Sequence, residues 1–130
     1  MGGGPGVAVG VGVVATRKAA RELPRSVERY LATKVADRAA LVDSVFAAHA
    51  TVHDEGRTYV GTDAIRQWAT DLAQQLTITS TLDQLVQDGD QVIAHFTYTG
   101  DFPGSPARRS SHFTVERGER GLITTLDIRE

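Results

Sequence analysis

Two segments in the second half of the chain alternate between apolar and polar residues, a pattern typical of strands buried on one face. They span residues 91–99 and 109–116, and residues 100–106 between them hold two prolines and two glycines. Such a short, turn-rich connection indicates two antiparallel strands. The residues expected on the face of the aromatic side chains are Val92, Ala94, Phe96, Tyr98, Ser111, Phe113 and Val115.

Residues 77–87 and 122–128 are the other predicted strands of this half, and a short strand is predicted at 51–54. Helical spacing of apolar residues predicts the rest of the first half to be helical. The first predicted helix covers 24–36. The second is capped by Asp37 and has an apolar stripe of Leu41, Val42, Val45 and Phe46. The third is capped by Thr62 or Asp63, and its apolar face holds Ile65, Trp68, Ala69 and Leu72. Helices followed by a meander of strands predict an α+β fold, in which the helices cover one face of the sheet.

The chain has 130 residues, a formal charge of −2 and no cysteine. This length suits one domain with its own core. The slight negative charge argues against nucleic acid as a partner, which requires a basic face. The adjacent pair Arg108 and Arg109 is interpreted as part of a solvated loop. Without cysteine there is neither a disulfide framework nor thiolate chemistry, and a cytoplasmic location is expected.

Residues 1–22 are expected to form a disordered, glycine-rich tail before a single domain at 23–130. Six of the first twelve residues are glycine, which raises the entropic cost of ordering this segment. The apolar run at 7–15 is too short to span a membrane, so no membrane association is expected. A cleaved export signal is the alternative, although Arg17 and Lys18 follow the apolar run instead of preceding it.

Asp54 is the first candidate catalytic residue, because it lies where a predicted strand meets a loop. In an apolar pocket it can act as a general base. The alternative is that the sequence Asp-Glu-Gly forms a turn and the carboxylate binds nearby backbone amides. Tyr30 is the second candidate, either as a hydrogen-bond donor to a ligand oxygen or as a core aromatic residue.

The aromatic residues either line a ligand cavity or fill a core. The candidate ligand-binding residues are Phe46, Trp68, Phe96, Tyr98, Phe113 and Ser111. His49 and His53 are spaced four apart, but no glutamate follows His49 as a helical zinc motif requires, and we predict no metal site. His95 and His112 alternate with the aromatic residues and are expected to face outward or towards a partner subunit.

Three stretches of the chain resemble the NTF2-like superfamily, and within it the SnoaL-like and ketosteroid-isomerase-like branch. They are residues 27–31 (VERYL), 45–68, and 102–128 with the FPGSP loop. The resemblance implies a strongly bent sheet, antiparallel or mixed, wrapped around N-terminal helices, with a conical cavity open at one end. It also implies that Tyr30 donates to the substrate oxyanion and that Asp54 shuttles the proton. The second acid of ketosteroid isomerases belongs on the penultimate strand, where this chain has Ser111 and no carboxylate.

Two functions follow as hypotheses. The first is proton transfer by Asp54, of the isomerase, cyclase or dehydratase type, on a small hydrophobic molecule that is cyclic or carbonyl-bearing, without a cofactor. The second is a non-catalytic module for ligand binding or dimerisation. A homodimer compatible with either would pair through the outer face of the sheet, whose residues are Ile93, His95, Thr97, His112 and Thr114.

Overall fold

The predicted order of helices followed by strands is present in the computed structural model, which describes residues 23–75, 78–117 and 120–130. The predicted tail at 1–22 lies outside the described residues. The helical elements are α3 (Arg25–Ala32), the 3-10 helix η2 (Val35–Leu41), α4 (Val42–Val45) and α5 (Thr62–Gln75). The strands are β1 (Phe46–Asp54), β2 (Arg57–Val60), β3 (Ile78–Asp88), β4 (Gln91–Gly100), β5 (Ala107–Val115) and β6 (Ile123–Arg129).

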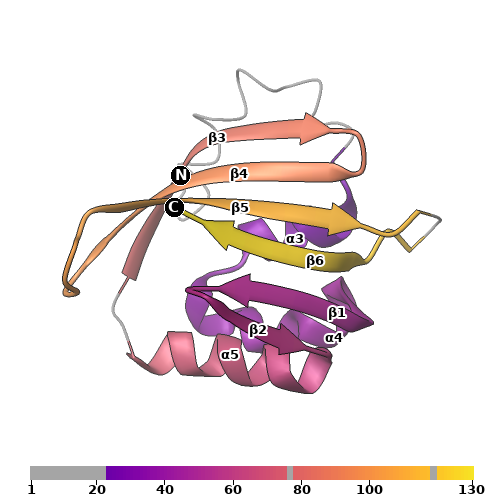
Figure 1. Cartoon of the computed structure of the whole chain (residues 1–130), viewed down its shortest axis with the longest axis horizontal. Helices are drawn as coiled ribbons and strands as arrows, with labels where there is room; N and C mark the ends of the chain where they lie inside the picture. The colour runs from indigo at the N-terminus through magenta and orange to yellow at the C-terminus, as the bar shows by residue number, and fades with distance from the viewer. Residues whose placement is uncertain (1–22, 76–77, 118–119) are drawn as a thin grey trace.

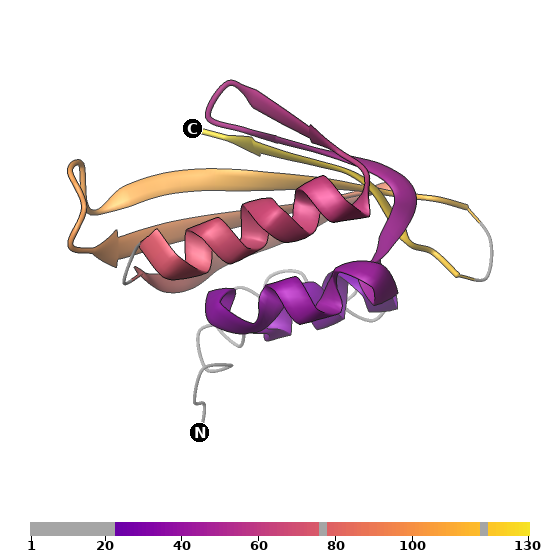
Figure 2. The same ribbon diagram turned by 90° about the horizontal axis from the view of Figure 1, so that it is seen from below.

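The six strands form one mixed sheet in the order β2-β1-β6-β5-β4-β3 (Figure 1). Only the pairing of β1 with β6 is parallel among these neighbours. Helices α3, α4 and α5 lie on the same side of the sheet, with α5 running beneath the strands (Figure 2). The α+β, NTF2-like architecture is therefore confirmed, with the helices against one face of a curled, open sheet.

The alternation in the C-terminal half accounts for the sheet's register. Val92 pairs with Phe113 across β4 and β5, and Phe113 pairs with Leu126 across β5 and β6. All three side chains are fully buried, so this face of the sheet meets the helices. A shift of one residue in any of these strands would turn its apolar set toward solvent.

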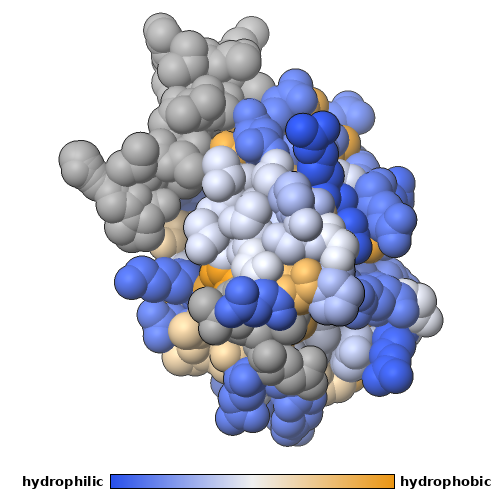
Figure 3. Space-filling model, turned by 90° about the vertical axis from the view of Figure 1, so that its left-hand side faces the viewer, coloured by the Kyte–Doolittle hydropathy of each residue, from blue (hydrophilic) through white to orange (hydrophobic). Residues whose placement is uncertain are grey.

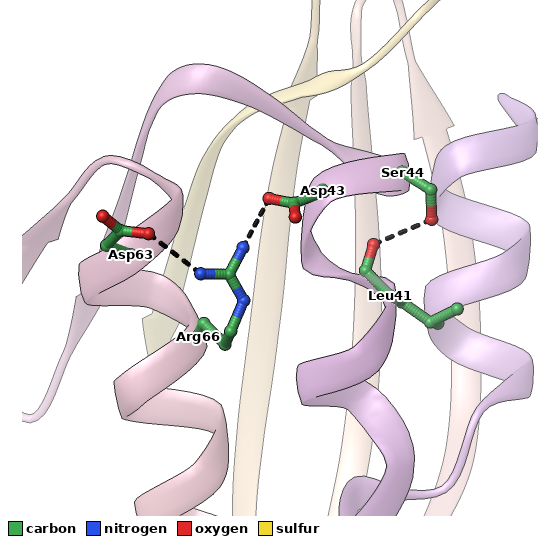
Figure 4. A network of polar contacts seen from close by, with 5 residues as sticks. All are labelled: Leu41, Asp43, Ser44, Asp63 and Arg66. Atoms are coloured by element: carbon green, nitrogen blue, oxygen red, sulfur yellow. Dashed lines mark hydrogen bonds and ion pairs between the residues drawn. The ribbon is translucent and has the colours of Figure 1, made fainter.

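The long helix α5 packs as predicted, but it already includes Thr62 and Asp63, the two residues predicted as its cap. Gly61 precedes it with a φ of 88°, and the Gly61 N–H donates to the Ala50 carbonyl over 2.8 Å. Ile65, Trp68 and Ala69 are buried, which is the spacing of one helix face. Arg66, on another part of the helix surface, pairs with Asp63 of the same helix and with Asp43 of α4 (Figure 4). These ion pairs are exposed and screened by solvent, so the buried face contributes most to the docking of α5.

The predicted helices at 24–36 and after Asp37 are wrong in their boundaries. The first helix ends at Ala32, because Thr33 and Lys34 are extended, and a 3-10 helix replaces most of the second. Phe46, placed on the helical stripe by its spacing, begins β1 instead. Apolar residues at three- and four-residue intervals fit both a helix and a 3-10 turn that leads into a buried strand, so spacing alone did not distinguish them.

The segment predicted as a short strand and a loop forms a hairpin. Strand β1 starts five residues before the predicted Thr51, and β2 replaces the loop. Glu55 and Gly56 make the two-residue turn with φ values of 52° and 77°. Positive φ at both central residues is the type I′ geometry that matches the twist of paired strands. The turn places Asp54 at the last paired position of β1, opposite Arg57.

Among the described residues, no helix is long and apolar enough to cross a membrane.

Candidate functional site

A cavity of about 470 Å³ lies between the helices and the buried face of the sheet. It opens beside the β4–β5 connection, where Phe102, Pro103 and Gly104 form part of its rim. Figure 3 views this end of the molecule and shows apolar atoms at the surface between polar regions. The apolar walls come from η2, α5 and the strands, through Val35, Ala69, Leu72, Ile78, Phe96 and Ile128. This volume suits a small organic molecule.

Asp54 lies at the end of β1 and lines this cavity. Its Oδ2 accepts a hydrogen bond of 3.0 Å from Nε1 of Trp68 on α5. The predicted turn does form immediately after Asp54, yet the hydrogen bond that the structure shows for the carboxylate comes from the indole and not from turn amides. The bond ties the end of β1 to α5, and in the described part of the chain it is the one side-chain hydrogen bond to this carboxylate.

Tyr30, on α3, lines the same cavity from the helical side. Its ring packs edge-on against Phe46 and Phe113, with centroid distances of 5.7 and 5.6 Å. Burial raises the pKa of Tyr30, and the nearby Arg38 guanidinium opposes part of this rise. The phenol therefore stays protonated at neutral pH and can act as a hydrogen-bond donor.

Tyr98, on β4, is a second phenol in the cavity wall, stacked on Phe96 at 5.5 Å. Burial is the main cause that raises the pKa of Tyr98 to about 12, with Arg38 opposing it. Both tyrosines are thus donors whose hydroxyl groups resist ionisation. Ser111, which is buried on β5, adds a third hydroxyl to the same wall.

The raised pKa of Tyr98 predicts a loss of stability at alkaline pH. Below about pH 10, the ordinary pKa of tyrosine, the folded and unfolded chains both keep the proton. Between pH 10 and the folded value of about 12, the unfolded chain loses it and the folded chain retains it. The free energy of unfolding should then fall by up to about 1.4 kcal/mol per pH unit for this group.

Urea unfolding of the wild type and of Tyr98→Phe at steps from pH 8 to 11.5 measures this effect. The variant should lose a large part of the alkaline slope, because its ring has no proton to release. The part of the alkaline slope that is caused by Tyr30, whose pKa is also raised, should remain. Equal slopes in the two proteins would contradict the assignment to Tyr98.

The structure brings together six of the eight residues proposed from the sequence. Those lining the cavity are Tyr30, Asp54, Trp68, Phe96, Tyr98 and Ser111. Phe46 and Phe113, which were predicted to bind ligand, are not among the lining residues. They are 1% and 0% exposed and lie against the ring of Tyr30, so they belong to the core.

Sequence reasoning missed the arginines of the site. Arg38 of η2 and both Arg108 and Arg109 line the cavity, as does Glu55. The interpretation of Arg108 and Arg109 as a solvated loop is wrong, because both belong to β5. The alternation of β5 contained the signal for one of them, since Arg109 is two residues from Ser111 and shares its face. For Arg38 there was no signal, because the position of η2 depends on packing.

The four histidines do not line the cavity. His53 is turned away from the Asp54 side and contacts the Thr58 hydroxyl over 3.1 Å. His95 and His112 lie on paired strands at positions that alternate with the buried residues, as expected. In the described part of the chain, no group of three or more His, Cys, Asp or Glu side chains is arranged to hold a metal ion.

Comparison with known proteins gives one family and many similar folds. The sequence profile of the SnoaL-like domain matches residues 27–125. A candidate polyketide cyclase from Sinorhizobium meliloti is 30% identical and has a TM-score of 0.72, over 84% of this chain and 97% of that one. A protein of ketosteroid isomerase-like fold from Catenulispora acidiphila, solved with trimethylamine, is 23% identical, with a TM-score of 0.61 over 82% and 85%.

A candidate ketosteroid isomerase from Shewanella frigidimarina is 17% identical, with a TM-score of 0.58 over 79% of this chain and 90% of that one. At the identities of these last two proteins the likeness supports the fold alone. A search of curated protein sequences finds no match.

Proposed function

Because the chain belongs to the SnoaL-like domain family, we propose that its cavity binds a small cyclic or carbonyl-bearing molecule and catalyses a proton transfer on it. The reaction is of the isomerase, cyclase or dehydratase type. The observation that supports this proposal is that Asp54 and Tyr30, which come from different layers of the fold, line one apolar cavity. A carboxylate and a protonated phenol facing one cavity are the base and the donor that such chemistry needs.

In this mechanism Asp54 removes a proton from a carbon next to a carbonyl group. Its hydrogen bond to Trp68 holds the carboxylate in place while the free oxygen approaches the C–H bond. Negative charge moves to the carbonyl oxygen, which the Tyr30 hydroxyl stabilises by donating a hydrogen bond. Tyr98 and Ser111 supply further hydroxyl groups in the same wall.

A second candidate function is ligand binding without chemistry. It is favoured by Ser111, which occupies the wall where the resemblance places a second acid. A serine hydroxyl donates a weaker hydrogen bond to a developing oxyanion than a protonated carboxyl group does. The two functions differ in whether bound molecules exchange protons with solvent.

Deuterium incorporation from D₂O separates these two functions. Small aromatic ketones, such as 2-tetralone and 1-phenyl-2-propanone, are incubated with the protein, and exchange next to the carbonyl is followed by NMR. The wild type should accelerate exchange, and Tyr30→Phe should lower the accelerated rate roughly 10²-fold, because one oxyanion donor is lost while the ring still packs.

The fluorescence of Trp68, the only tryptophan of the chain, reports binding in the same samples. Binding without exchange for every ketone would overturn the catalytic proposal and favour the binding module. An unchanged exchange rate in Tyr30→Phe would remove Tyr30 from the mechanism.

A further inference from the structure

Arg38 is a charged side chain in the cavity wall that the proposed proton transfer does not use. It is half-buried, and its Nε donates to the Thr33 carbonyl over 2.9 Å. Its guanidinium carbon lies 4.4 Å from the centre of the Tyr30 ring. It makes no ion pair within the described ranges 23–75, 78–117 and 120–130. The guanidinium also lies within hydrogen-bonding reach of the Tyr30 hydroxyl and lowers its pKa, which opposes the effect of burial. A guanidinium has five N–H donors, so Arg38 retains donors for an external acceptor.

The charges of the cavity wall do not balance. Three arginines line the cavity, Arg38, Arg108 and Arg109, against two carboxylates, Asp54 and Glu55. Arg38, Arg109 and Asp54 are half-buried, whereas Arg108 and Glu55 are exposed. One positive charge is therefore in excess, and a ligand with a single negative charge neutralises it.

The base and the arginine are separate within the cavity. Asp54 receives a hydrogen bond from Trp68 and is not paired with Arg38. Yet both charges act on Tyr30 and on Tyr98, so the two phenols lie within electrostatic range of each. All four side chains line the same cavity, so a ligand there can place an anionic group at Arg38, a reacting C–H bond at Asp54 and a polar oxygen at a phenol.

We propose that the substrate class is small oxo acids, whose carboxylate binds the Arg38 guanidinium while the carbonyl group faces Tyr30 and the neighbouring C–H bond faces Asp54. This inference deepens the proposed function and rests on it. A planar guanidinium binds a carboxylate through two parallel hydrogen bonds, which fixes the orientation of the ligand. The apolar walls, which include Leu72, Phe96 and Ile128, receive the hydrocarbon part.

The proton transfer balances without another reactant. Asp54 takes the proton from the carbon next to the carbonyl, and the electron pair of that C–H bond forms a C=C bond. The carbonyl oxygen receives the charge and accepts a hydrogen bond from Tyr30. Return of the proton from Asp54 to this or a conjugated carbon completes the reaction, with no change in oxidation state.

Binding of 3-phenylpropanoate and its neutral amide, 3-phenylpropanamide, tests the anion site apart from catalysis, because neither molecule is a substrate. Isothermal titration should show the carboxylate binding at least about tenfold more tightly to the wild type. Arg38→Gln should abolish this preference. Arg38→Lys should retain part of it, because lysine keeps the positive charge but lacks the paired N–H donors of the guanidinium. Arg57→Gln, which removes the same charge from an exposed position on β2 outside the cavity wall, should leave the preference unchanged.

A wild-type preference below about threefold, a difference too small for a charge-assisted hydrogen bond, would overturn the proposal, whether or not the Arg38 variants fold. So would a full preference in a folded Arg38→Gln protein, with folding checked by circular dichroism. Exchange of phenylpyruvate and its methyl ester with D₂O then tests the reaction. Carboxylate preference without exchange would overturn the proposed function and leave the anion site standing. Equal exchange of the acid and the ester would overturn the carboxylate site and leave the proposed proton transfer standing.

Discussion

Replacing Asp54 with asparagine is expected to lower the rate of solvent proton exchange into bound carbonyl compounds by about 10²–10⁴-fold. Asparagine has nearly the shape of aspartate, and its amide oxygen can still accept the 3.0 Å hydrogen bond from Trp68. The amide, however, is not a base at neutral pH. The variant should therefore bind ligands and quench Trp68 fluorescence as the wild type does, while the chemical step is lost.

Asp88→Asn is the matched control, because Asp88 is exposed at the end of β3 and does not line the cavity. It removes the same charge from the protein and should leave the exchange rate within about twofold, as expected for an isolated surface substitution. An Asp54→Asn protein with normal exchange would exclude Asp54 as the base. If both variants lost exchange, the cause would be net charge and not a group in the cavity.

Replacing Phe113 with alanine is expected to lower the free energy of unfolding by about 3–5 kcal/mol. The side chain is fully buried at the middle of the sheet, where it pairs with Val92 and Leu126 and meets the Tyr30 ring. Truncation removes these contacts and leaves a void that the neighbouring strands cannot close. For a small domain this is a large part of the total stability of about 5–15 kcal/mol.

Urea unfolding followed by Trp68 fluorescence measures the change. Phe102→Ala is the control, since Phe102 is only half-buried at the cavity rim, and the expected loss is below about 1 kcal/mol. Equal losses in the two variants would contradict the assignment of Phe113 to the core. The Phe113 variant should also loosen Tyr30, so ligand affinity should fall with stability.

Strands were easier to predict than the early helices, for a physical reason. In β4 and β5 each residue faces either the helices or the outside, so the period of two is visible in the sequence. The helix α5 shows its period as clearly, through Ile65, Trp68 and Ala69. The segment from Thr33 to Phe46 has no such single period, because it is a 3-10 helix, one α-helical turn and the start of a strand.

The candidate site was also predictable only in part. The position of Asp54 at the end of a strand was predictable, because the following Glu55 and Gly56 are typical turn residues. That its carboxylate meets Trp68 was not, because the bond depends on how α5 lies under β1. Phe46 and Phe113 have the same chemistry as Phe96, and only packing decides that Phe96 lines the cavity and that the other two do not.

The sequence by itself determined the α+β class, the strands of the C-terminal half and the helix α5. These follow from residue periods and from local turn chemistry, which neighbours along the chain are sufficient to define. The tertiary structure alone decided that Asp54 and Tyr30 share a cavity, that Arg38 joins them, and that β1 runs parallel to β6. Each of these depends on contacts between residues far apart in the chain, and the free energy of those contacts is not encoded in any local pattern.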